Sequence, residues 1–154
     1  MSKNFEVSFN SPQCGWMSIG FEHDGGEFHT TTAHAPHTTA LADVLNTVSG
    51  LLCKEGDYTR ELKWNRDPEE YDFSFSRSGD ICTIGITEYP TSARERGEVV
   101  YRFEGEAIEI AKAFLATFQQ MYEERNIDEF EENWHQEFPV EEFEGLKEAV
   151  ASFG

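Results

Sequence analysis

The spacing of apolar residues changes from every second position to every third or fourth position twice along this chain, which contains 154 residues. Alternation at every second position is typical of a strand with one buried face, whereas spacing of three and four is typical of an amphipathic helix. Alternation runs through Phe5–Phe9, Met17–Phe21 and the Thr-rich stretch Glu27–Ala35, and helical spacing follows over Leu41–Leu52. The first part of the chain therefore predicts three strands and a helix, which Thr38 or Thr39 can cap.

The second part of the chain repeats this change of spacing. Alternating residues predict strands over 58–64, 71–75, 81–88 and 99–103, and a broad apolar stripe predicts a helix over 107–122. Two short amphipathic segments, 130–134 and 143–153, close the chain. Short turns between strands, with helices in separate blocks, indicate an α+β fold. We expect a single domain over 1–154, with an antiparallel sheet of about six to seven strands covered by helices in the order βββα-ββββα-αα.

The charge of the chain restricts its partners. Asp and Glu number 30 against 12 Lys and Arg, which gives a net charge of −18. Such a surface repels phosphate backbones and anionic lipid headgroups, so binding to nucleic acid or to a membrane is not expected. No apolar run approaches the length of a membrane span or of a leader peptide, and the expected location is cytoplasmic. The acidity has two interpretations: it attracts a basic partner, or it serves solubility alone.

The acidic residues are most crowded over 122–148. Eleven Asp and Glu stand there against Arg125 and Lys147, which is half the net charge of the chain. On a helix, Phe130, Trp134 and Phe138 would form one stripe, which packs on the domain or anchors a partner. A docking face with aromatic anchors and an acidic rim predicts these partner-binding residues: Glu124, Asp128, Glu131, Glu132, Trp134 and Glu141.

Four of the five histidines lie in the segment His23–His37. Neutral imidazole is a common zinc ligand, and His29, His34 and His37 are the candidate metal ligands. On a regular strand, however, His29 and His34 face opposite sides, and no carboxylate spacing joins them. We expect surface or packing histidines here, with no metal and no cofactor, and keep a metal site as the alternative.

Sequence motifs for catalysis are absent. There is no phosphate-binding loop, no nucleophile elbow and no CxxC pair among the three cysteines. The adjacent pairs Glu69–Glu70 and Glu131–Glu132 are interpreted as solvent-facing, and Pro90–Gly97 as an exposed loop. No catalytic residue is therefore assigned, and a non-enzymatic role is favoured over an enzyme.

Three short stretches support a resemblance. Leu62-Lys63-Trp64, Asp67-Pro68-Glu69-Glu70-Tyr71, and Ser78-Gly79-Asp80 leading into 81–86 resemble small uncharacterised bacterial proteins. The order of elements and the acidity are similar to immunity proteins of bacterial toxin systems, which are acidic domains that cap a basic toxin. The resemblance implies protein binding, and no functional residue is carried over from it.

Three hypotheses of function remain. The first is a non-catalytic binding protein, of the immunity or inhibitor type, that presents its acidic surface to a basic protein partner. The second is a small enzyme or metal-binding protein that uses the region His23–His37. The third is a structural domain that self-associates, as a homodimer, through the aromatic stripe.

Overall fold

The computed structural model describes residues 5–153. Its first sheet contains three antiparallel strands, β1 (Glu6–Phe9), β2 (Trp16–His23) and β3 (Gly26–Ala33), in spatial order β1-β2-β3. Phe9 lies opposite Ile19 in this sheet, so apolar side chains share one face. The other face carries exposed polar side chains, as alternation along a half-buried strand requires.

The second sheet is an antiparallel meander of four strands. It contains β4 (Tyr58–Asn65), β5 (Glu70–Ser78), β6 (Ile81–Tyr89) and β7 (Glu98–Glu106), in spatial order β4-β5-β6-β7. The β5–β6 turn includes Gly79, whose φ of +63° lies in the left-handed region that glycine adopts without strain. The predicted α+β class and the antiparallel pairing are therefore confirmed.

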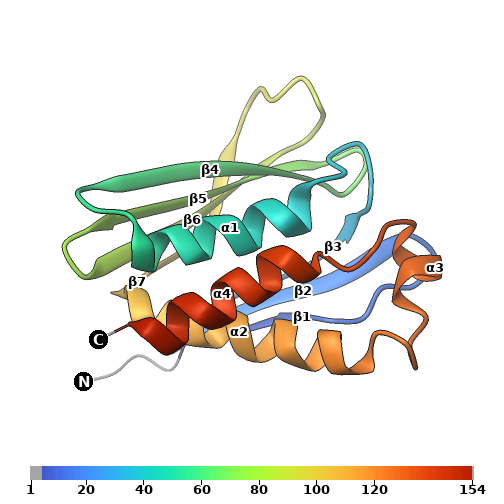
Figure 1. Ribbon diagram of the computed structural model, residues 1–154. Helices are drawn as coiled ribbons and strands as arrows, with labels where there is room; N and C mark the ends of the chain where they lie inside the picture. Colours follow the sequence, from blue (N-terminus) through green and yellow to red (C-terminus); the bar gives the residue numbers. More distant parts are fainter. Residues whose placement is uncertain (1–4, 154) are drawn as a thin grey trace.

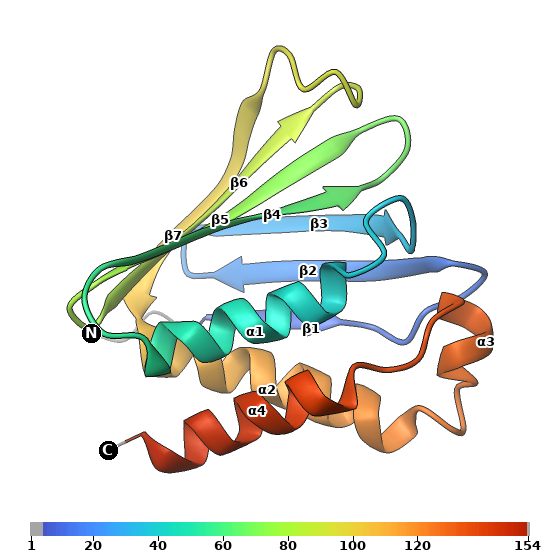
Figure 2. The same cartoon turned by 45° about the horizontal axis from the view of Figure 1, so that its top comes forward.

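The expectation of one sheet of six to seven strands is wrong, because the strands form two sheets. β3 contacts both β4 and β7, but among residues 5–153 no ladder of hydrogen bonds joins the two sheets. Figure 2 shows β4–β7 fanning out on the far side of β2 and β3 from the helices. Alternation determines which face of a strand is buried, but it carries no information about which edges pair.

Helices α1 (Ala40–Cys53), α2 (Ala107–Glu124) and α4 (Val140–Ser152) contact one another and cover one side of the sheets (Figure 1). The short helix α3 (Phe130–Trp134) lies at one end of this layer. Thr39 is the N-cap of α1, as expected, but its side chain does not cap the helix. The Thr39 hydroxyl instead donates to the Asp43 carboxylate at 2.9 Å. No helix within residues 5–153 is both long enough and apolar enough to cross a membrane.

The core lies between the helices and the inner faces of both sheets. Phe114 of α2 is fully buried and its ring lies 5.9 Å from those of Phe9 and Phe21 and 6.0 Å from that of Phe75. Val7, Ile19, Phe21, Leu41, Leu45 and Val48, which the apolar spacing places on inner faces, are buried in the structure, whereas Phe5 is half-buried against the same cluster. One hydrophobic cluster therefore holds the two sheets and the helices together.

Candidate functional site

The aromatic residues of the C-terminal segment point into the domain. Trp134 is 2% exposed and Phe138 is 7% exposed, and the rings of Phe130 and Phe138 lie 5.3 Å apart. The three residues do not form one helical stripe, since α3 ends at Trp134 and His135 takes a left-handed conformation with φ of 67°. Phe138 reaches the core from the segment that follows. Most of the surface of these three rings is therefore buried in the domain, which leaves little of it exposed to a partner or to a second copy of the chain.

The carboxylates of the same segment point outward. Glu131, Glu132 and Glu141 are exposed, and Glu124 and Asp128 are half-buried. Asp128 accepts a hydrogen bond of 2.6 Å from the hydroxyl of Ser11, which attaches this segment to the loop after β1. Of the six predicted partner-binding residues, Trp134 is thus the one that packs inside the domain.

A hollow of about 480 Å³ lies between the C-terminal end of α2, α3 and the start of α4. Phe130 and Phe138 line it together with Val140, which is 40% exposed. Its charged lining consists of four carboxylates and one guanidinium: Glu129, Glu131, Glu132, Glu137 and Arg125. We call this feature the acidic hollow. It combines an apolar floor with a strongly negative wall.

The charge of the acidic hollow is not neutralised by the chain itself. Within residues 5–153, no carboxylate of the segment 122–148 forms an ion pair with Arg or Lys. The Arg125 guanidinium lies 3.8 Å from the centre of the Tyr122 ring and donates to the Tyr122 carbonyl at 2.5 Å. Arg125 offsets only part of the negative charge, since four carboxylates line the hollow with this one guanidinium, and a net negative field remains available to a partner.

The histidines predicted as a group are separated in the structure. His23 shares a hydrogen bond of 2.7 Å with the Tyr101 hydroxyl, and the ring of His34 lies 4.6 Å from that of His135. His37 donates to Glu70, whereas His29 contacts Glu22 and Glu27. His29, His34 and His37 thus have different partners. The sequence showed no carboxylate spacing that joins the histidines, but strand pairing brings Glu22 and Glu27 to His29.

Glu70 is the centre of a buried polar cluster that sequence reasoning missed. It was expected to face solvent with Glu69, but its side chain is only 3% exposed. Glu70 Oε1 accepts from His37 Nε2 at 2.8 Å and from Arg94 Nη2 at 2.5 Å, and Oε2 accepts from Asn65. Burial alone would raise the pKa of Glu70, but hydrogen bonds from Asn65 and His37 and the charges of His37 and Arg94 hold that pKa below its usual value.

Arg94 connects this cluster to the loop between β6 and β7. Its second guanidinium nitrogen donates to Asp72, whose other oxygen accepts from the Tyr89 hydroxyl at 2.9 Å. The loop Pro90–Gly97 is exposed as expected, except at Arg94, whose side chain is only 18% exposed. Each carboxylate oxygen of Glu70 and Asp72 already has a partner. The cluster is therefore suited to anchoring the loops around His37 and Arg94 rather than to receiving a ligand.

One signal in the sequence could have indicated this cluster. Glu70 and Asp72 are two residues apart in β5 and therefore lie on one face of the strand, whereas Tyr71 and Phe73 lie on the other face. Two acids on one face of a central strand need cationic or hydrogen-bonding partners if anything covers that face. The covering loop with Arg94 lies more than twenty positions later, and local pattern alone does not reveal it.

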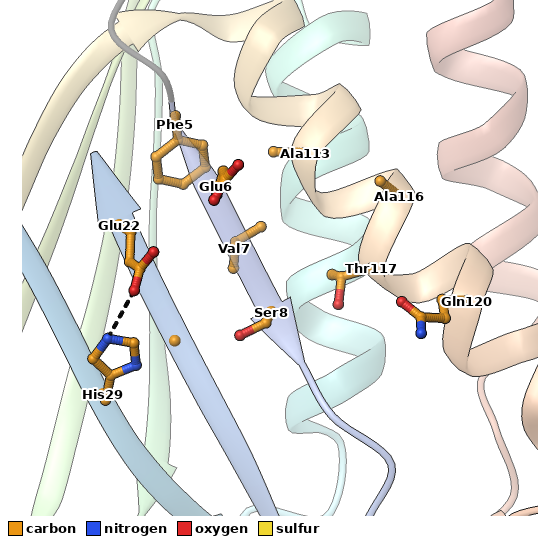
Figure 3. Close-up of a pocket in the computed structure, with 11 residues that line it drawn as sticks. Phe5, Glu6, Val7, Ser8, Glu22, His29, Ala113, Ala116, Thr117 and Gln120 are labelled. Atoms are coloured by element: carbon orange, nitrogen blue, oxygen red, sulfur yellow. Dashed lines mark ion pairs between the residues drawn. The ribbon is translucent and has the colours of Figure 1, made fainter. Parts of the chain in front are cut away.

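A second cavity, of about 440 Å³, lies between the first sheet and α2. Figure 3 shows Glu22 and His29, from neighbouring strands, joined at one side of it, with Thr117 and Gln120 of α2 on the other side. His29 Nε2 lies 3.2 Å from Glu22 Oε1. This cavity is thus lined by metal-ligating side chains that the sequence did not group.

Comparison with known proteins does not identify a family: no family model matches the chain, and searches of curated proteins and of solved structures found no match.

Proposed function

We propose that this protein is a non-catalytic binding protein that uses the acidic hollow to engage a basic protein partner. The observation that carries the proposal is the set of four carboxylates around an apolar floor, with no Arg or Lys ion pair among the described residues to neutralise them. A Lys or Arg side chain of a partner can place its charge among the carboxylates and its aliphatic stem on the floor.

Apolar residues beside the carboxylates support binding of a protein rather than of a small cation alone. Val140 lines the hollow at 40% exposure, and Ile127, in the segment between α2 and α3, is 82% exposed. Protein interfaces combine desolvated apolar contacts with a polar rim. The immunity or inhibitor role implied by the resemblance agrees with such a surface, since an acidic domain of that kind covers a basic toxin.

Charge reversal in the hollow tests the proposal. The tagged full chain and a Glu131→Lys/Glu132→Lys variant are used to capture proteins from native lysate at about 0.05 M and 0.3 M NaCl. The control is Glu55→Lys/Asp57→Lys, which makes the same change of charge at exposed positions in the α1–β4 loop. Captured proteins are identified by mass spectrometry, and the affinity of each is then measured with purified components.

The proposal predicts a basic protein that binds the wild type and the control but loses binding to the Glu131/Glu132 variant. Its affinity should fall with salt, mainly through a slower association rate. Equal binding by both variants would place the interaction elsewhere. Recovery of no basic protein at either salt concentration would contradict the proposal.

A further inference from the structure

We propose that Glu22, Glu27 and His29 form a binding site for a divalent transition metal ion on the exposed face of the β2–β3 hairpin. One ligating atom of each side chain lies within 4.8 Å of those of the other two. A donor set of one imidazole nitrogen and two carboxylate oxygens suits Zn²⁺, which takes nitrogen and oxygen ligands and accepts water at open positions. The site is separate from the acidic hollow and does not depend on the proposed function.

The distances agree with ligands that share one ion. Two ligand atoms about 2.1 Å from a tetrahedral Zn²⁺ lie about 3.4 Å from each other. The observed separations are 3.2 Å from His29 Nε2 to Glu22 Oε1 and 3.9 Å from His29 Nε2 to Glu27 Oε2. The three side chains are exposed, so a small rotation of the Glu27 side chain can bring its carboxylate closer to the other two ligands.

The hairpin itself positions the ligands. Glu22 and Glu27 are directly opposite each other, and His29 lies two residues beyond Glu27 on the same face of β3. Gly20 is the residue opposite His29, and a Cβ atom at Gly20 would lie 2.8 Å from His29 Nδ1. The absence of a side chain at Gly20 therefore leaves room for the His29 ring to lie over the strand.

The surrounding charge favours a bound cation. Glu6, Glu22 and Glu27 lie opposite one another across β1, β2 and β3, which places three carboxylates in one row on the sheet. Like charges directly opposite in a sheet are destabilising. Among the described residues, Glu22 and Glu27 form ion pairs with His29 and with no Lys or Arg. A divalent ion would relieve this repulsion.

The adjacent cavity gives the ion access to solvent. Glu22 and His29 line the cavity of about 440 Å³ that is bounded by Ser8 on β1 and by Thr117 and Gln120 on α2 (Figure 3). Water completes the coordination from this side, as in zinc sites with three protein ligands. The arrangement is thus an open metal site beside a hollow rather than a closed structural site.

Calorimetric titration of the full chain with Zn²⁺ tests the site. Excess Mg²⁺ and about 0.15 M NaCl suppress diffuse binding to other carboxylates, because Mg²⁺ prefers oxygen ligands and does not compete well for imidazole. We expect one Zn²⁺ to bind per chain. The affinity for Zn²⁺ should fall by about tenfold or more in each of the variants His29→Gln, Glu22→Gln and Glu27→Gln. Glu27 is 70% exposed, so its variant keeps the fold.

Two further variants distinguish this site from other zinc binding. His34→Gln removes a ring that lies 4.6 Å from His135 and should leave the affinity unchanged. Gly20→Ala keeps all three ligands but displaces the His29 ring, and should weaken binding. The proposal would be overturned if the wild type did not bind Zn²⁺ or if His34→Gln abolished binding. It would also be overturned if His29→Gln and Glu27→Gln left the affinity unchanged.

Discussion

At the scale of single residues, Glu70 shows that an acidic residue expected at the surface can be buried among polar partners. Glu69 and Glu70 are adjacent in the chain, yet Glu69 is half-buried while Glu70 is almost fully enclosed by His37, Asn65 and Arg94. A buried carboxylate is stable only when charged and hydrogen-bonded partners replace water. Its environment therefore depends on Arg94, which no local pattern around Glu70 reveals.

Replacing Glu70 should make the stability of the protein less dependent on pH. The pKa of Glu70 is lower in the folded state than the usual value near 4.5, so its ionised form stabilises the fold above that value. This contribution is lost as the pH falls through the folded pKa. We expect Glu70→Gln to lower the free energy of unfolding by about 3 kcal/mol at pH 7 and by clearly less at about pH 3.5.

Urea denaturation at the two pH values measures this difference, with Glu69→Gln as the control for the adjacent acid. The control should change stability by less than about 0.5 kcal/mol at pH 7. A cost of Glu70→Gln that is equal at both pH values would show that the Glu70 charge does not contribute to stability.

At the scale of elements, α1 combines a local pattern with a contact that the pattern does not predict. The apolar spacing of Leu41, Val44, Leu45 and Val48 predicts α1, and all four residues are buried. Gly50 is also buried inside this helix, where glycine is unfavourable by about 1 kcal/mol relative to alanine. The reason for a glycine at this position lies outside the helix, because a Cβ at Gly50 would collide with the Tyr58 hydroxyl and lie 2.5 Å from Tyr58 Cζ.

Gly50→Ala should therefore destabilise the protein, although the same change in an open helix stabilises it. We expect a loss of about 1–3 kcal/mol, as for overpacking of a core. In the background of Tyr58→Ala, which removes the ring, the same substitution should become neutral or stabilising. Thermal unfolding of the four proteins of this double-mutant cycle measures the coupling, and a coupling near zero would show that the two residues do not collide.

The C-terminal segment shows the limit of helical spacing as a predictor. Phe130, Trp134 and Phe138 have the spacing of one helical stripe, and all three are buried as such a stripe would be. The helix nevertheless ends at Trp134, because His135 adopts a left-handed conformation. The spacing therefore predicted the burial of these rings correctly, but it did not predict where the helix ends.

At the scale of the whole molecule, α2 joins two sheets that the sequence predicted as one. Phe114 contacts aromatic rings of β1, β2 and β5, which belong to both sheets. Hydrogen bonds hold the strands together within each sheet, whereas buried side chains hold the sheets to each other. The relative placement of the sheets thus depends on side-chain packing.

Truncation of Phe114 tests this role. We expect Phe114→Ala to lower the free energy of unfolding by about 3–5 kcal/mol, because it removes a fully buried ring and leaves a cavity between the sheets. Leu115→Ala, at the neighbouring half-buried position of α2, is the control and should cost clearly less. Equal losses in urea denaturation would show that the buried face of α2 is assigned incorrectly.

The sequence by itself determined the strands, the helices, the antiparallel class and most of the core, because apolar period is a property of neighbouring residues. It also determined the crowding of carboxylates over 122–148. Only the tertiary structure decided the division into two sheets, the pairing of Glu70 with Arg94 and the meeting of Glu22 with His29. Each of these depends on register, edge pairing or loop closure between residues that are separated in the chain. Such contacts produce no periodic pattern among neighbouring residues from which they could be predicted.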